Sequence, residues 1–80
     1  MPYITRMRRN SIDYGDEPHT AGELNYKLTS VINDYLGDGL SYAKLNEVIG
    51  ALECAKLELY RRLAAPYEDT KIQENGDVYR

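Results

Sequence analysis

Two arginines and two tyrosines in the second half of the chain have the chemistry of an anion-binding site. Tyr60, Arg61 and Arg62 are consecutive, and Tyr67 follows after little more than one turn. A guanidinium holds phosphate through a planar fork of donors, and a tyrosine ring can stack on a base while its hydroxyl bonds a sugar or phosphate oxygen. The alternative is that Tyr60 belongs to the core and that both arginines are ordinary surface residues near the negative end of a helix.

Further basic and aromatic side chains can reach the same site if the N-terminal arm folds back. Arg6, Arg8 and Arg9 form a cluster after Tyr3, and Lys71 follows the second tyrosine of the first group. Together these side chains offer several donors for phosphate oxygens. We therefore predict a ligand-binding site that is formed by Tyr3, Arg6, Arg9, Tyr60, Arg61, Arg62, Tyr67 and Lys71.

Side chains for catalysis are sparse. Cys54 is the one thiol and His19 the one imidazole, and no third residue completes a nucleophilic arrangement with them. The sequence has no phosphate-binding G-x-x-x-x-G-K-[ST] or G-x-G-x-x-G loop. Glu74 and Asp77 match half of the carboxylate pattern of small helical nucleotide hydrolases, but an Asn-Gly pair separates them and no E-x-x-E is present. We expect no enzymatic activity, no cofactor and no metal site.

The element that must carry the arginines is a helix over residues 41–65. Ser41 can cap its first amides, and Leu40 before it can pack on the first turn. Pro66 predicts an end or a kink, because its ring clashes with the carbonyl four residues back. Apolar residues recur along one face at three- and four-residue steps: Leu45, Val48, Ile49, Leu52, Ala55, Leu59 and Leu63.

A first helix is predicted over residues 20–36. Thr20 and Glu23 have the spacing of a capping box, in which the hydroxyl accepts the Glu23 amide and the carboxylate accepts the Thr20 amide. Gly37 suits the left-handed residue that closes a helix. Because the link to the main helix is short, the two helices should form an antiparallel hairpin.

The two ends of the chain are less regular. Residues 1–19 read as an irregular arm with at most a short helical turn, since they carry both charge clusters and few apolar anchors. Residues 66–80 form either a helix that stops at Asn75-Gly76 or two strands around a type I′ turn there. We favour the helix, because Glu, Lys and Gln suit it better. Residues 2–4 and 77–79 should be extended.

Composition favours one small mainly α domain over residues 1–80 that gains stability by assembly. A chain of 80 residues buries a modest core, and a single cysteine allows no internal disulfide. Gly50, Ala51, Cys54 and Ala55 allow close approach of a second helix, either from the same chain or from another copy. We therefore expect a homo-oligomer, a dimer or a tetramer.

Charge and hydropathy limit the classes of partner that the protein is expected to bind. The net charge of −3 opposes general DNA binding, and a helix-turn-helix DNA-binding role is also opposed by Glu47 early on the second helix. No segment resembles a membrane span or a signal peptide, which predicts a cytoplasmic protein. Eight tyrosines with no phenylalanine or tryptophan suggest that several phenols face polar groups or a ligand.

Several segments resemble one family of small proteins from tailed phages and prophages, described as a domain of unknown function. The resemblance covers most of the chain but departs over residues 5–20, where that family usually has a longer first helix. It rests on MPYI, Gly22-Glu23-Leu24-Asn25-Tyr26, Leu40-Ser41-Tyr42, Asn46-Glu47-Val48-Ile49-Gly50, Ala64-Ala65-Pro66-Tyr67-Glu68-Asp69 and Glu74-Asn75-Gly76-Asp77-Val78-Tyr79.

The resemblance implies a role in the infected cell. Compact phage proteins of this size include nucleotide "sponges", homo-oligomers that sequester the cyclic nucleotide signals of bacterial immunity systems such as CBASS and Thoeris. A symmetric pocket with Arg, Lys and Tyr suffices for this role. We predict immune evasion by binding a cyclic nucleotide without cleaving it, in the host cytoplasm. The alternative is a protein–protein module that inhibits a host enzyme or transcription factor.

Overall fold

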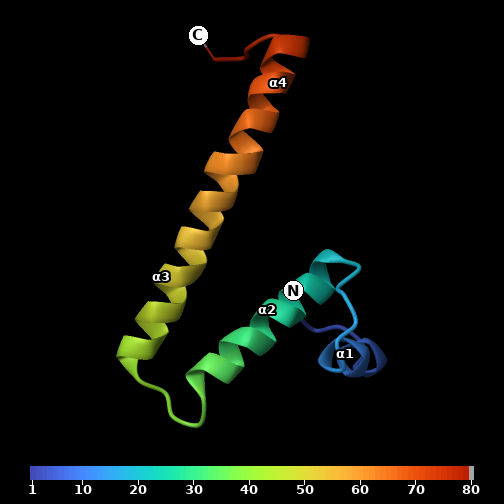
Figure 1. Ribbon diagram of the computed structural model, residues 1–80, viewed down its shortest axis with the longest axis vertical. Coiled ribbons are helices and arrows are strands. Elements are labelled where there is room, and N and C mark those ends of the chain that lie inside the picture. The colour runs from blue at the N-terminus through green and yellow to red at the C-terminus, as the bar shows by residue number, and fades with distance from the viewer. Residues whose placement is uncertain (80) are drawn as a thin grey trace. The chain divides into compact units, whose positions relative to one another are not determined.

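The computed structural model describes residues 1–79 and confirms a mainly helical fold, with no strand in that part of the chain. The chain divides into two compact units, one over Met1–Ser41 and one that begins at Tyr42. The single domain expected from the sequence stays a prediction. Figure 1 shows the elements: α1 (Arg6–Asp13), α2 (Ala21–Leu36), α3 (Tyr42–Leu59), the π-helical segment η1 (Tyr60–Ala64) and α4 (Ala65–Asn75).

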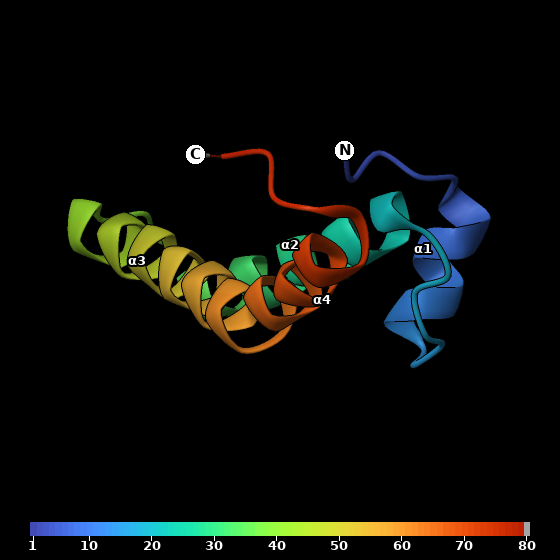
Figure 2. The ribbon, with the colours of Figure 1, turned by 90° about the horizontal axis from the view of Figure 1, so that it is seen from above.

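The irregular arm predicted for residues 1–19 is wrong over α1. Thr5 caps this helix, where its Oγ1 accepts the Arg8 N–H at 3.3 Å. Gly15 adopts a φ of +109° in the turn that follows the helix, a conformation that favours glycine. Figure 2 shows α1 beside the first turns of α2, and Ile12 is 1% exposed. One buried side chain therefore anchors a helix that has few apolar residues.

The predicted first helix is confirmed, with one correction at its cap. Thr20 Oγ1 accepts the Glu23 N–H at 3.1 Å, as the capping box requires. The Glu23 carboxylate, however, accepts the N–H of His19 at 2.9 Å instead of the Thr20 N–H. Gly37 closes α2 with a φ of +68°, and its N–H donates to the Asn33 carbonyl at 3.1 Å.

Of the two outcomes predicted at Pro66, an end or a kink of the main helix, the end is wrong. The helix continues from α3 through η1 into α4, and Pro66 is the second residue of α4. The Ala65 N–H donates to the carbonyl of Tyr60, five residues back, which is the π-helical pattern. The wider turn accommodates a ring that would clash with the Arg62 carbonyl in a regular helix. The distortion expected from proline is therefore absorbed without ending the helix.

The C-terminal segment follows the helical alternative. α4 ends at Asn75, and Gly76 closes it with a φ of +91° while its N–H donates to the Ile72 carbonyl at 2.8 Å. The strand alternative for this segment is wrong. Two features predicted for the start of α3, a cap at Ser41 and packing of Leu40 on the first turn, stay predictions.

Candidate functional site

Five of the predicted ligand-binding residues lie on η1 and α4. Arg61 Nη2 is 2.7 Å from Glu58 Oε1, and Arg62 Nη1 is 4.0 Å from the same oxygen. The two arginine side chains are 71% and 70% exposed, so these ion pairs are surface pairs that a ligand can replace at little cost. The alternative that both are ordinary surface residues therefore agrees with this geometry as well. The others of this group are Tyr60, Tyr67 and Lys71.

The two tyrosines of this segment, Tyr60 and Tyr67, lie next to acidic or basic side chains rather than in an apolar core. The Tyr60 hydroxyl donates to Glu68 Oε1 at 2.8 Å, and this bond with the nearby carboxylate charge raises the pKa of Tyr60. Lys71 Nζ lies 5.5 Å from the centre of the Tyr67 ring and 3.0 Å from Glu74 Oε2. Tyr60 is 54% exposed, which argues against the alternative that it is a core residue within its unit.

A shallow hollow of about 470 Å³ lies on the same helix beside one of the arginines. It is lined by Ala55, Glu58, Leu59, Arg62 and Leu63. Three of these side chains are apolar, and the other two carry a guanidinium and a carboxylate. Such a surface can hold an apolar ring next to an anionic group. Of the predicted ligand-binding residues, Arg62 is the one that lines this hollow.

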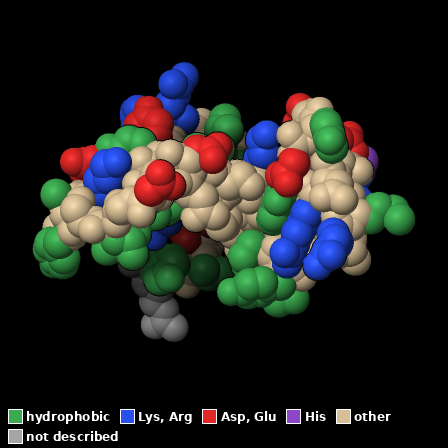
Figure 3. Space-filling model, turned by 90° about the horizontal axis from the view of Figure 1, so that it is seen from below, with side chains coloured by type: hydrophobic (Ala, Val, Ile, Leu, Met, Phe, Trp, Pro, Cys, Tyr) green, Lys and Arg blue, Asp and Glu red, His purple; other side chains and the backbone are tan. Residues whose placement is uncertain are grey.

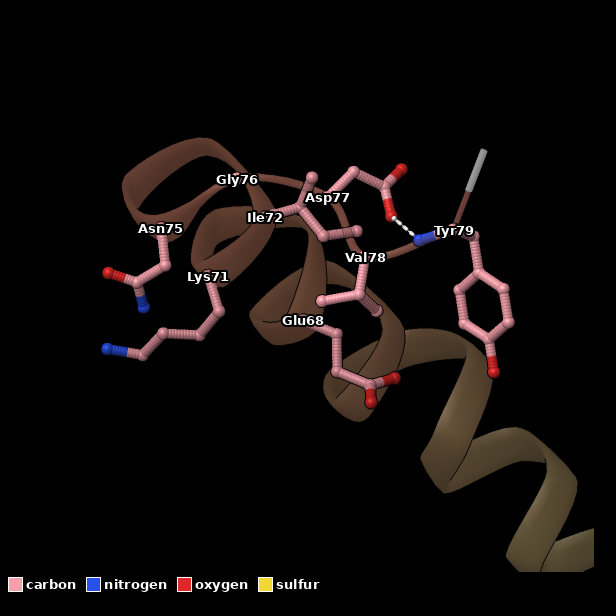
Figure 4. Close-up of a pocket in the computed structure, with 8 residues that line it drawn as sticks. All are labelled: Glu68, Lys71, Ile72, Asn75, Gly76, Asp77, Val78 and Tyr79. Carbon is pink, nitrogen blue, oxygen red and sulfur yellow. Dashed lines mark hydrogen bonds between the residues drawn. The ribbon is translucent and has the colours of Figure 1, made fainter.

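A second hollow, of about 330 Å³, forms where the chain turns back after α4 (Figure 4). Ile72 and Val78 lie at its centre, and the Asp77 carboxylate accepts the N–H of Tyr79 at 2.9 Å. Lys71 extends to the opposite side of α4 from Tyr79 in this view. The hollow therefore contains one predicted binding residue, Lys71, at its edge.

The N-terminal binding residues belong to the other unit, and one of them has a structural role. Arg9 Nε donates to the Ile4 carbonyl at 3.1 Å, and its guanidinium lies 5.9 Å from the centre of the Tyr26 ring. Tyr3 and Arg6 are exposed. The convergence of these residues with the arginines of η1 stays a prediction.

The most extensive polar network in the first unit was not predicted from the sequence. The Arg8 guanidinium donates to both carboxylate oxygens of Glu23, at 2.7 and 3.0 Å, and to Asp16 Oδ2 at 2.8 Å. We call these three residues the Arg8 clasp. Glu23 is 8% exposed, so its charge needs this pairing. The hydrogen bonds from Arg8 and from the His19 N–H lower the pKa of Glu23 to about 2, against an opposing effect of burial. The clasp holds α1 on α2.

Apolar side chains on the main helix are widely exposed. Figure 3 shows apolar groups gathered in patches on the visible surface. The second unit has no further helix or strand among its described residues, so nothing within it covers the apolar face of α3 and α4. The exposed fractions reach 59% for Leu59, 65% for Leu63 and 64% for Tyr67. These values are typical of a surface that meets a partner.

Residues 1–79 contain no cluster of three or more His, Cys, Asp or Glu side chains placed to hold a metal ion. No helix within the same residues combines the length and the hydropathy that a membrane crossing requires. Cys54, the one thiol, is exposed on α3. The predicted binding residues are cationic and phenolic side chains.

These features define a small helical protein in which exposed cations lie next to an exposed apolar face. A family model matches residues 1–78, and the family is described as a domain of unknown function (DUF6899). The chain belongs to this family. No curated protein and no solved structure matches it.

Proposed function

We propose that this protein forms a homo-oligomer that binds an anionic nucleotide, a cyclic dinucleotide, and sequesters it without cleavage. The observation that carries the proposal is the exposed pair of Arg61 and Arg62, of which Arg62 lines a hollow together with Leu59 and Leu63. Guanidinium forks bind phosphate oxygens, and an apolar surface next to them receives a base. Tyr67 and Lys71 supply a ring and a further cation on the same helix.

Helix lengths support assembly. Residues 42–75 form a continuous helix of about 51 Å, whereas α2 with its 16 residues measures about 24 Å. The antiparallel hairpin predicted from the sequence for α2 and α3 stays a prediction. A helix of the length of α2 is too short to cover the whole of residues 42–75. A second copy of the chain covers the remainder.

The biological role extends the same proposal. The resemblance to phage and prophage proteins implies a protein that acts in the host cytoplasm. There it would remove the cyclic nucleotide signal of a defence system such as CBASS or Thoeris. Sequestration requires tight binding and slow release. A surface that is rich in Arg, Lys and Tyr can supply tight binding, because these side chains contact phosphate groups and bases.

A second function uses the same exposed face. A host protein can dock on the apolar side chains around Leu63. In this second function the chain inhibits a host enzyme or transcription factor. The exposed fractions of Leu59, Leu63 and Tyr67 favour a protein partner of some kind. The two functions differ in whether a nucleotide binds the purified protein.

Titration calorimetry against cyclic di- and trinucleotides tests the proposal. We expect at least one member of the panel to bind, and chromatography after heat denaturation should recover it intact. Absence of binding across the panel would favour the host-protein inhibitor. Recovery of linear or hydrolysed nucleotide would instead identify an enzyme and contradict sequestration.

A further inference from the structure

The π-helical segment keeps the apolar stripe of the second unit on one face. Up to Leu59 the stripe advances by alternating steps of three and four residues, and then by two steps of four. In a regular α-helix, consecutive four-residue steps rotate away from the stripe. The π turn inserts one residue at Tyr60–Ala64 and compensates for that rotation. The continuous stripe consists of Leu45, Val48, Leu52, Ala55, Leu59, Leu63 and Tyr67.

We propose that the part of this stripe from Ala55 to Tyr67 pairs antiparallel with the same part of a second copy, about a two-fold axis at the level of Arg61. The inference rests on the assembly in the proposed function and specifies its interface. Such an axis places Leu59 opposite Leu63 of the partner subunit, and Ala55 opposite Tyr67 of the partner subunit. Each pair occurs twice, as in any isologous interface.

The sizes of the paired side chains suit this register. The small Ala55 lies at one end of the hollow of about 470 Å³, and the large Tyr67 ring of the partner subunit would face it there. The two leucines fill the centre. Packing that alternates large and small side chains across facing positions leaves few voids. In this register the hollow lies at the junction between the two copies.

The charges on both flanks of the stripe are complementary in the same register. On one flank Lys56 faces Glu68 of the partner subunit, and on the other flank Glu58 faces Arg62 of the partner subunit. Within one chain Lys56 makes an exposed pair with Glu53 at 3.4 Å, so it is available for exchange. Opposite charges beside an apolar seam set partner and orientation in helical pairs. This complementarity identifies the occupant as a second copy.

The register also separates the two arginines. Arg62 lines the hollow that meets the second copy, whereas Arg61 does not line it and pairs with Glu58 at 2.7 Å. Arg62 therefore contributes to assembly as well as to the ligand site, whereas Arg61 contributes to the ligand site alone. Arg62→Ala should weaken both association and ligand binding. Arg61→Ala should weaken ligand binding alone.

Complementary charge reversals test the register. Lys56→Glu places like charges opposite Glu68, and Glu68→Lys places like charges opposite Lys56, so each variant should self-associate at least tenfold more weakly in sedimentation velocity. A mixture of the two variants restores both pairs and should associate within about threefold of the wild type. Asp69→Lys, one residue along but on the far face, is the matched control and should not rescue Lys56→Glu.

A wild-type monomer at 100 μM, on the order of a hundredfold above a typical micromolar Kd, would overturn the proposal. Association without selective rescue in the mixture would overturn it as well, because it would require another register or face. Circular dichroism of each variant checks that helicity is unchanged. If the rescue occurs but no nucleotide binds, the interface stands and the proposed function fails.

Discussion

Replacing Arg61 with alanine should weaken the binding of the cyclic nucleotide at least tenfold. Arg61 is 71% exposed, and the Glu58 carboxylate is its ion-pair partner in the free protein. When the ligand binds, Arg61 exchanges that surface pair for a phosphate group. Because water is excluded from the occupied site, a charged hydrogen bond is stronger there than on the surface. The fold should survive, because Arg61 does not belong to the apolar stripe.

Two variants sharpen this prediction. Glu58→Gln frees Arg61 from its carboxylate partner but also removes the charge opposite Arg62 of the partner subunit, so it should weaken association. Tyr67→Phe keeps the ring and removes only the hydroxyl, so it should cost less than Arg61→Ala. Calorimetry with one cyclic dinucleotide ranks all three proteins. An Arg61→Ala protein that binds as tightly as the wild type would exclude the phosphate contact.

Acid should release α1 from α2 in the first unit. The pKa of Glu23 is lowered to about 2 from an ordinary value of 4.5, mainly by the hydrogen bonds from Arg8. A lowered pKa means that the ionised carboxylate stabilises the fold above pH 4.5, and that this stabilisation is lost as the pH falls from 4.5 towards 2. Arg8 also lowers the pKa of Asp16, which adds to the loss in acid.

The Ile12 methyl resonances report this release in NMR spectra, because Ile12 is buried between the helices. We expect them to lose their native shifts between pH 4.5 and 2. Glu23→Gln should weaken the packing already at pH 7 and remove most of this pH dependence. Glu53→Gln on α3 changes an exposed surface pair and should leave the Ile12 signals unaffected. Native Ile12 shifts at pH 2 would show that the clasp does not hold α1.

Local signals predicted much of the helical structure. Thr20, Gly37 and Gly76 mark helix ends through hydrogen bonds and backbone angles that depend on a few neighbouring residues, and all three have the predicted role. The α4 helix follows from its Glu, Lys and Gln content. Signals of this kind can be read without knowledge of the tertiary contacts.

The errors arise where distant residues or competing local effects decide the outcome. α1 depends on Ile12 and Arg8 meeting α2, and the partners of Arg8 are 8 and 15 residues away along the chain. At Pro66 the helix could end, kink or widen, and proline alone does not distinguish these outcomes. Of the candidate site, the sequence predicts the group from Tyr60 to Lys71, which lies on one continuous helix in the structure. It does not predict the structural role of Arg9.

The central claim is that copies of this chain assemble and hold an intact anionic nucleotide. Native mass spectrometry of protein purified from cells that make cyclic nucleotides measures the assembly and the bound molecule together. We predict a mass of an even number of chains plus an intact cyclic nucleotide, and loss of the nucleotide alone in Arg61→Ala. A monomer that carries no small molecule would contradict the claim.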